Sequence, residues 1–256
     1  MLARRIFAAI IALVFLMQTL SIAFACAAAP PEVDKIVFVH YANNAKARPP
    51  PQETGTYKLM GIKWATLQVP FAVNYAGSGI GEAIVKSTIL LAANEWDDGT
   101  YSLSKGISGK GTKANLFSDY TDSNVPTTTE TMAYDGTNCI FWGSITDSNT
   151  IAVTSVWYTR VGRQILEFDM EFNTYYSWTV SPNGVSGTMD LQNIATHELG
   201  HSVGLDDLYT SSATKETMYG YSSYGITSAR DLYLGDQASL YVPEMLVNQF
   251  PILAHR

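Results

Sequence analysis

Cysteine is almost absent from this chain, which has only Cys26 and Cys139 among its 256 residues. Cys26 lies at the end of an apolar N-terminal segment, so Cys139 has no partner if that segment is removed or if Cys26 carries a lipid. We therefore expect no disulfide framework in the mature protein. A chain of this length can instead bury a full hydrophobic core in one domain.

Charge is also scarce. Charged residues make up 15% of the chain, compared with roughly 25% in an average soluble protein. Positive charge is the scarcer kind, since 16 Lys and Arg stand against 23 Asp and Glu, giving a net charge of −7. This balance gives no reason to expect a nucleic-acid partner, because nucleic-acid binding depends on a basic surface. It suits a soluble protein outside the cell.

The chain opens with the features of an export signal. Met1 to Arg5 is short and basic, and Ile6 to Ala25 is a mostly apolar run that ends in small residues. We expect residues 1–25 to be a signal peptide, which predicts a secreted, extracellular protein. The same run is about long enough to span a bilayer, so an uncleaved anchor at the cell surface is the alternative. A lipid on Cys26 would also tether the protein to a membrane.

Proline is concentrated just after this segment. Residues 26–57 include Pro30-Pro31 and Pro49-Pro50-Pro51, which disfavour regular structure. We interpret 26–57 as a linker or short pro-region with one strand-like insert, Lys35 to His40, and we expect His40 to be a surface or packing histidine. Residues 58–256 then form the predicted functional domain.

The rest of the chain alternates helical and strand-like patterns, as in an α+β fold. Apolar residues recur near the 3.6-residue period from Gly81 to Asp97, where Asp97-Asp98-Gly99 predicts the end of a long helix. Acidic and apolar residues alternate from Gln164 to Asn173, which predicts a sheet with one buried face. The other predicted strands are Lys63 to Tyr75, Asn138 to Ile145 and Ile151 to Thr159.

The strongest chemical pattern lies around a histidine pair. His197 and His201 are four residues apart, so on a helix they point the same way and could bind one metal ion. Glu198 lies beside them, where its carboxylate could deprotonate a metal-bound water. Gly204 would end the helix, since glycine takes a positive φ without steric cost, and Asp207 could then return as a third ligand. Two helical histidines can also be ordinary core packing, but an acid and a glycine at this spacing are specific.

These five residues carry a resemblance to a known family. His197, Glu198, His201, Gly204 and Asp207 match the motif H-E-x-x-H-x-x-G-x-x-H/D of the metzincin metallopeptidases, in its aspartate variant. The chain therefore resembles a metzincin, in which one catalytic zinc ion is held by the residues at the positions of His197, His201 and Asp207.

The resemblance extends beyond the zinc motif. Glu216-Thr217-Met218-Tyr219 resembles the family's Met-turn, in which a methionine, here Met218, lies beneath the metal ligands. The order of the predicted elements is similar to that of matrixin-like members. The resemblance implies a zincin fold with a mixed twisted sheet, a long first helix, an active-site helix starting near Asp190 and a C-terminal helix at Leu234 to Tyr241.

By resemblance, the protein would be a secreted zinc-dependent endopeptidase. Glu198 would be the general base, and a protein or peptide substrate would add as an extra strand to an open sheet edge. The strand that forms this edge would contain Ile151, Ala152, Val153 and Thr154. We expect a monomer.

Several alternatives stay open. Asp206 is a competing third ligand, and Glu216 would take that place in a thermolysin-like zincin. Structural calcium could bind at Asp119 and Asp122, or near Asp169 to Asn173, where matrixins carry structural metal sites. A cysteine switch is excluded, since no P-R-C-G segment occurs. From a different class, the chain could be a secreted or surface binding or adhesion module that keeps zinc for stability alone.

Overall fold

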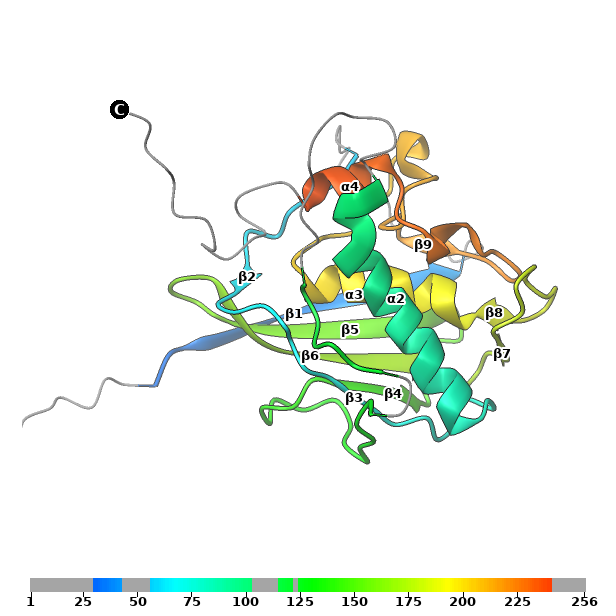
Figure 1. Cartoon of the computed structure of the whole chain (residues 1–256), viewed down its shortest axis with the longest axis horizontal. Helices are drawn as coiled ribbons and strands as arrows, with labels where there is room; N and C mark the ends of the chain where they lie inside the picture. The colour runs from blue at the N-terminus through cyan, green and yellow to red at the C-terminus, as the bar shows by residue number, and fades with distance from the viewer. Residues whose placement is uncertain (1–29, 43–55, 103–114, 122–123, 241–256) are drawn as a thin grey trace, which may run out of the picture. The chain divides into compact units, whose positions relative to one another are not determined.

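The computed structural model describes residues 30–42, 56–102, 115–121 and 124–240, without the side chains of 98–102 (Figure 1). The predicted signal peptide, Cys26 and Asp122 lie outside the described residues. The chain divides into two compact units, Met1–Pro31 and Glu32–Arg256, and all described elements belong to the second.

The described part of the chain combines three α-helices with a mixed sheet, so the α+β prediction is confirmed. The helices are α2 (Glu82–Ser102), α3 (Leu191–Ser202) and α4 (Leu234–Ser239), with 3-10 turns at Ser211–Ala213 and Ser228–Arg230. None of these described helices has the length and apolar character needed to cross a membrane.

Seven of the described strands form one sheet, and two more form a separate pair. The sheet order is β3 (Ala72–Val73), β4 (Cys139–Gly143), β6 (Gln164–Asn173), β5 (Thr150–Thr159), β1 (Val33–Ala42) and β9 (Tyr221–Ser222), with β2 (Lys63–Trp64) beside β6; the pair is β7 (Trp178–Thr179) and β8 (Met189–Asp190). Only β5 runs antiparallel to its neighbours among these strands. Figure 1 shows α2 crossing the long strands at an angle, while α3 runs nearly along them, and α3 contacts both α2 and β5.

Strands β4, β5 and β6 lie where the sequence predicts them, but two other elements differ in extent. Residues 63–75 form β2 and β3 instead of one strand, with Gln68 between them at φ +61°. Helix α2 continues past Asp97 to Ser102. The Asp97 carboxylate accepts the backbone N–H of Leu116 (2.6 Å), so it makes a tertiary contact and does not compete with the helix.

The stretch predicted to be a linker contains a full strand of the sheet. β1 spans ten residues within 26–57 and pairs antiparallel with β5. Its alternate residues Phe38, His40 and Ala42 are buried. The strand-like insert of the predicted linker or pro-region is therefore longer than Lys35 to His40, and it pairs with the sheet from Val33 onward.

Strand β5 is not an edge strand. β6 lies on one side of it and β1 on the other. In the register with β1, Thr154 lies opposite Phe38 and Ala152 lies opposite His40. The prediction of an open edge at 151–154 is therefore wrong, because β1 covers that edge.

Both faces of β6 are buried, although the alternating pattern predicts only one. Phe168 and Met170 lie in the main core. On the opposite face Glu167 and Asp169 are also fully buried, because backbone N–H groups of the segment 133–139 donate to their carboxylates. Burial raises the pKa of Asp169 to about 7.

Helix α3 packs closely on its surroundings. The Trp96 indole N–H of α2 donates to the carbonyl of Thr196 at 2.8 Å. A Cβ on Gly200 would lie 2.2 Å from Met218 Sδ and 2.7 Å from Trp96 Cζ2. Glycine at position 200 therefore permits this close approach.

Gly200→Ala should destabilise the fold by about 1–3 kcal/mol, because the added methyl group has no space between Trp96 and Met218. Urea denaturation followed by circular dichroism measures the change. Gly81→Ala is the matched control, since a Cβ there would meet no atom within 4 Å. Equal stability of the two variants would contradict this packing.

Candidate metal centre

Helix α3 carries the histidine pair and begins where the sequence predicts. The Asp190 carboxylate caps it by accepting the backbone N–H of Asn193 (2.9 Å), and Arg230 Nε donates to the same carboxylate (2.8 Å). The helix ends at Ser202, and Gly204 follows with φ +102°. This turn brings the following residues back toward the helix.

Donor atoms of the three predicted metal ligands face one another. Asp207 Oδ1 lies 3.2 Å from His197 Nε2 and 3.5 Å from His201 Nε2. All three atoms are buried and have no hydrogen-bond partner. Such atoms are rare in folded proteins, because each costs free energy. Neighbouring ligands of a tetrahedral zinc ion lie about 3.3 Å apart when the bonds are about 2.0 Å, so the spacing fits one such ion.

The other nitrogen of each imidazole bonds to a backbone carbonyl. His197 Nδ1 lies 2.7 Å from the oxygen of Thr217, and His201 Nδ1 lies 2.9 Å from the oxygen of Leu205. Because a carbonyl oxygen can only accept, both Nδ1 atoms must carry the proton. When a ring is neutral, the lone pair of its Nε2 atom is then available to a metal. Without a metal, burial acts to lower the pKa of His201, but Asp207, Glu198 and the Leu205 carbonyl raise it to about 9, so a metal would displace a proton from this nitrogen.

Asp207 is held as a carboxylate. Its second oxygen, Oδ2, accepts a hydrogen bond from the Tyr209 hydroxyl at 2.9 Å. Burial acts to raise the pKa of Asp207, but the positive charge of a protonated His201 and the close approach of both imidazoles hold it well below its usual range. The third donor is therefore an anionic oxygen.

The two alternative third ligands lie elsewhere. Asp206 Oδ2 pairs with Lys58 Nζ at 2.8 Å, and Glu216 Oε2 accepts the backbone N–H of Gly235 at 2.8 Å. Neither acid belongs to the group of metal-type side chains that contains the histidine pair. The geometry therefore favours Asp207.

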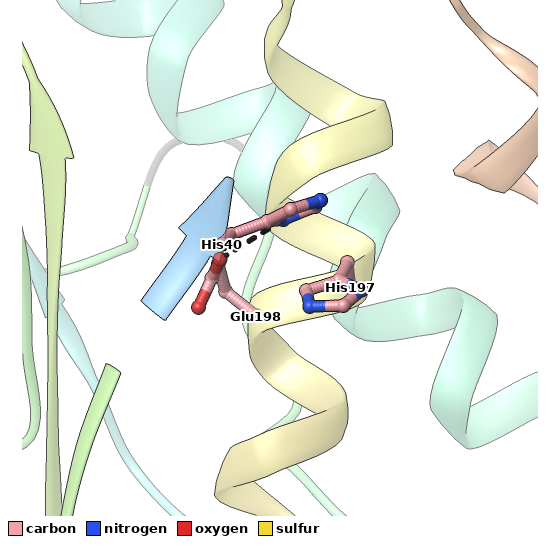
Figure 2. Close-up of side chains that lie close together, drawn as sticks. All are labelled: His40, His197 and Glu198. Atoms are coloured by element: carbon pink, nitrogen blue, oxygen red, sulfur yellow. Dashed lines mark hydrogen bonds and ion pairs between the residues drawn. The ribbon is translucent and has the colours of Figure 1, made fainter. Parts of the chain in front are cut away.

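Glu198 lies beside the ligands, and both oxygens of its carboxylate have partners. Oε2 accepts from Thr154 Oγ1 at 2.6 Å, and Oε1 accepts from His40 Nδ1 at 3.2 Å. Figure 2 shows His40 beside His197, and its dashed line joins His40 to the Glu198 carboxylate. Burial acts to raise the pKa of Glu198, but the hydrogen bond from His40 and the nearby imidazoles of His197 and His201 outweigh it and lower the pKa. Glu198 is therefore ionised.

The sequence did not reveal His40 as a site residue. Only 2% of its surface is exposed, so the surface interpretation is wrong. Its ring centroid lies 3.8 Å from that of His197, and its Nε2 is buried without a partner. Burial lowers the pKa of His40 to about 4, which keeps the ring neutral. A single histidine so far before the motif has no spacing relation to it, and only the pairing of β1 with β5 brings it there.

Met218 and the turn around it pack against helix α3. Met218 is fully buried, and its sulfur packs against Gly200, between the two histidines along the helix. The backbone N–H groups of Thr217 (2.6 Å) and Met218 (3.2 Å) donate to the Asp236 carboxylate of α4. Asp236, which no sequence pattern singled out, thus positions the carbonyl that holds His197.

The described residues form two groups of three metal-type side chains. One is His197, His201 and Asp207, and the other is His40, His197 and Glu198. Neither group includes Asp119 or Asp169, whose carboxylates accept hydrogen bonds from Asn115 and from the backbone. Structural calcium stays a prediction.

Comparison with models of known protein families gave no match, and a search of curated proteins gave none either.

Asp236→Ala should lower the zinc affinity by about 10–100-fold, because the Thr217 carbonyl would lose its fixed position behind His197. Competition with a chelating dye measures the affinity, and circular dichroism confirms the fold. Asp231→Ala, on the exposed surface, is the control. An affinity equal to that of the parent would show that the turn does not position His197.

Glu216→Gln should change how stability depends on pH. Burial and the nearby charge of Asp236 raise the pKa of Glu216 to about 7. The folded protein thus binds this proton more tightly than the unfolded chain, so stability should fall as pH rises from about 4.5 to about 7. Glutamine keeps an oxygen acceptor for Gly235 and removes the charge, so the variant should lose less stability over this range. Thermal denaturation at about pH 5 and about pH 8 tests this, and parallel curves would contradict it.

Proposed function

We propose that this protein is an exported zinc-dependent endopeptidase of the metzincin type, with a matrixin-like catalytic domain. The main support is one observation: the buried, unpartnered donor atoms of His197, His201 and Asp207 face one another. The ionised Glu198 lies beside them on the helix that carries both histidines. Export rests on the N-terminal sequence alone.

The donor set fits zinc. His197 Nε2, His201 Nε2 and Asp207 Oδ1 are ligand types that zinc accepts, and three protein ligands are typical of its catalytic sites. A bound zinc ion would lower the pKa of a water molecule and polarise a peptide carbonyl. Two histidines and a carboxylate also suit iron(II), which metal analysis distinguishes from zinc.

Glu198 supplies the proton transfers. Its ionised carboxylate accepts a proton as water attacks the peptide carbonyl, and it returns that proton to the leaving amine nitrogen. Thr154 Oγ1 fixes the orientation of this carboxylate at 2.6 Å. The peptide bond is broken, and both the acid and the amine are released.

A pocket beside the site could receive a substrate side chain. It has a volume of about 280 Å³, and its lining includes His40, Glu216, Tyr219, Tyr221 and Ile226. The size suits one side chain of a polypeptide and supports a peptide or protein substrate. By resemblance, this segment after Met218 walls the pocket for the residue that follows the cut bond.

A second candidate is a binding or adhesion module in which zinc only stabilises the fold. The burial of His197, His201 and Glu198, each 0% exposed, favours it, because a substrate cannot reach a closed site. A structural zinc ion, however, usually has four protein ligands, and Asp207 completes only three.

Glu198→Gln separates the two candidates. The variant should keep one zinc ion per chain and lose cleavage of an unfolded protein substrate by about 10²–10⁴-fold, because glutamine cannot accept the proton. Glu130→Gln, at an exposed position, is the control and should match the parent. Absence of zinc from the parent, or equal cleavage by parent and Glu198→Gln, would contradict the proposal.

A further inference from the structure

Strand β1 occupies the sheet edge that an extended polypeptide would otherwise use. It pairs antiparallel with β5, and Phe38, Val39 and His40 lie opposite Thr154, Val153 and Ala152. On its other side it pairs parallel with β9 through only two residues, Tyr41 and Ala42. Backbone pairing of this kind accepts any extended peptide, so β1 takes the place of a bound chain.

The side chains of β1 cover the candidate metal centre. The Phe38 ring stacks on His201 with centroids 4.0 Å apart, and the His40 ring lies 3.8 Å from that of His197. Both metal-site imidazoles are thus covered by rings from one strand. Because side chains alternate along a strand, Phe38 and His40 point to the same face.

His40 also engages the glutamate. Its Nδ1 donates to Glu198 Oε1, the oxygen that Thr154 leaves free. His40 does not belong to the group formed by His197, His201 and Asp207, so it is not placed as a further ligand of the same ion. His40 also lines the pocket of about 280 Å³ beside the site.

Outside the site, β1 is held by its backbone ladder with β5 and by surface contacts, without burial of its side chains. Of its first five residues none is buried, and Val37 is 47% exposed. At that end Arg160 pairs with both Asp34 and Glu32 at the surface, where solvent weakens ion pairs. The strands β3, β4, β6 and β5 pair with one another without β1.

We propose that β1 is a resident inhibitory strand, which fills the substrate groove between β5 and β9 and places His40 on Glu198, so that polypeptide is cleaved only after β1 leaves. This inference rests on the proposed peptidase function. It differs from inhibition through a cysteine ligand, because the contact is made by a histidine to the general base.

Two forms of the full-length, zinc-loaded protein test it. In the first, a recognition sequence for a site-specific protease is placed within 43–55, and the folded protein is compared before and after the cut. The second is the double variant Phe38→Ala/His40→Ala in the uncut chain. Val37→Ala, at an exposed position of the same strand, is the matched control.

Two rates are measured: cleavage of an unfolded protein substrate, and removal of zinc by excess chelator, which needs no catalysis. The cut should raise both by at least about tenfold. The double variant should raise both in part, and Val37→Ala should leave them unchanged.

The outcomes separate the two proposals. Faster zinc removal after the cut, with no cleavage by any form, supports the shielding by β1 and contradicts the peptidase function. Equal rates before and after the cut would overturn the inhibitory role of β1. Lower cleavage by both the cut protein and the double variant would also overturn the inhibitory role of β1. It would instead indicate that His40 helps to position Glu198 for catalysis.

Discussion

Two backbone carbonyl oxygens fix the orientation of the His197 and His201 imidazoles, and a turn and the C-terminal helix hold those two oxygens. The carbonyl behind His201 belongs to Leu205, in the turn that Gly204 allows. The same turn places Asp207 opposite the histidine pair. One local conformation therefore orients His201 and supplies the third candidate ligand. The carbonyl behind His197 belongs to Thr217, whose backbone N–H is held by α4. Hydrogen bonds thus connect α3, the turn at Thr217 and Met218, and α4 at the candidate site.

The arrangement has an energetic cost that the metal would offset. Four buried polar atoms of the site lack partners, of which a metal at His197, His201 and Asp207 would engage three. The acids Glu216 and Asp236 also lie close together near Met218. Fully buried packing around Trp96 and Gly200 keeps this polar cluster in one geometry. Since a preformed site rarely exists in the unfolded chain, the free energy of metal binding would also be free energy of folding.

Local patterns predicted the parts of the site that are close in sequence. The four-residue spacing of His197 and His201, the Asp190 cap and the glycine turn depend on helix geometry alone, and β6 coincides with its predicted range. Contacts between distant segments could not be predicted in this way. β1 pairs with a strand more than a hundred residues later, so neither its place in the sheet nor the contact of His40 with Glu198 leaves a local signal. The covered edge of β5 follows from the same pairing.

The most direct test of the proposed zinc centre at His197, His201 and Asp207 is the position of the ion itself. In a crystal of the zinc-loaded, full-length protein, anomalous diffraction at the zinc edge should give one peak, about 2.0–2.1 Å from His197 Nε2, His201 Nε2 and Asp207 Oδ1. A peak between His40 and Glu198, or no peak at the histidine pair, would contradict the site and the function built on it.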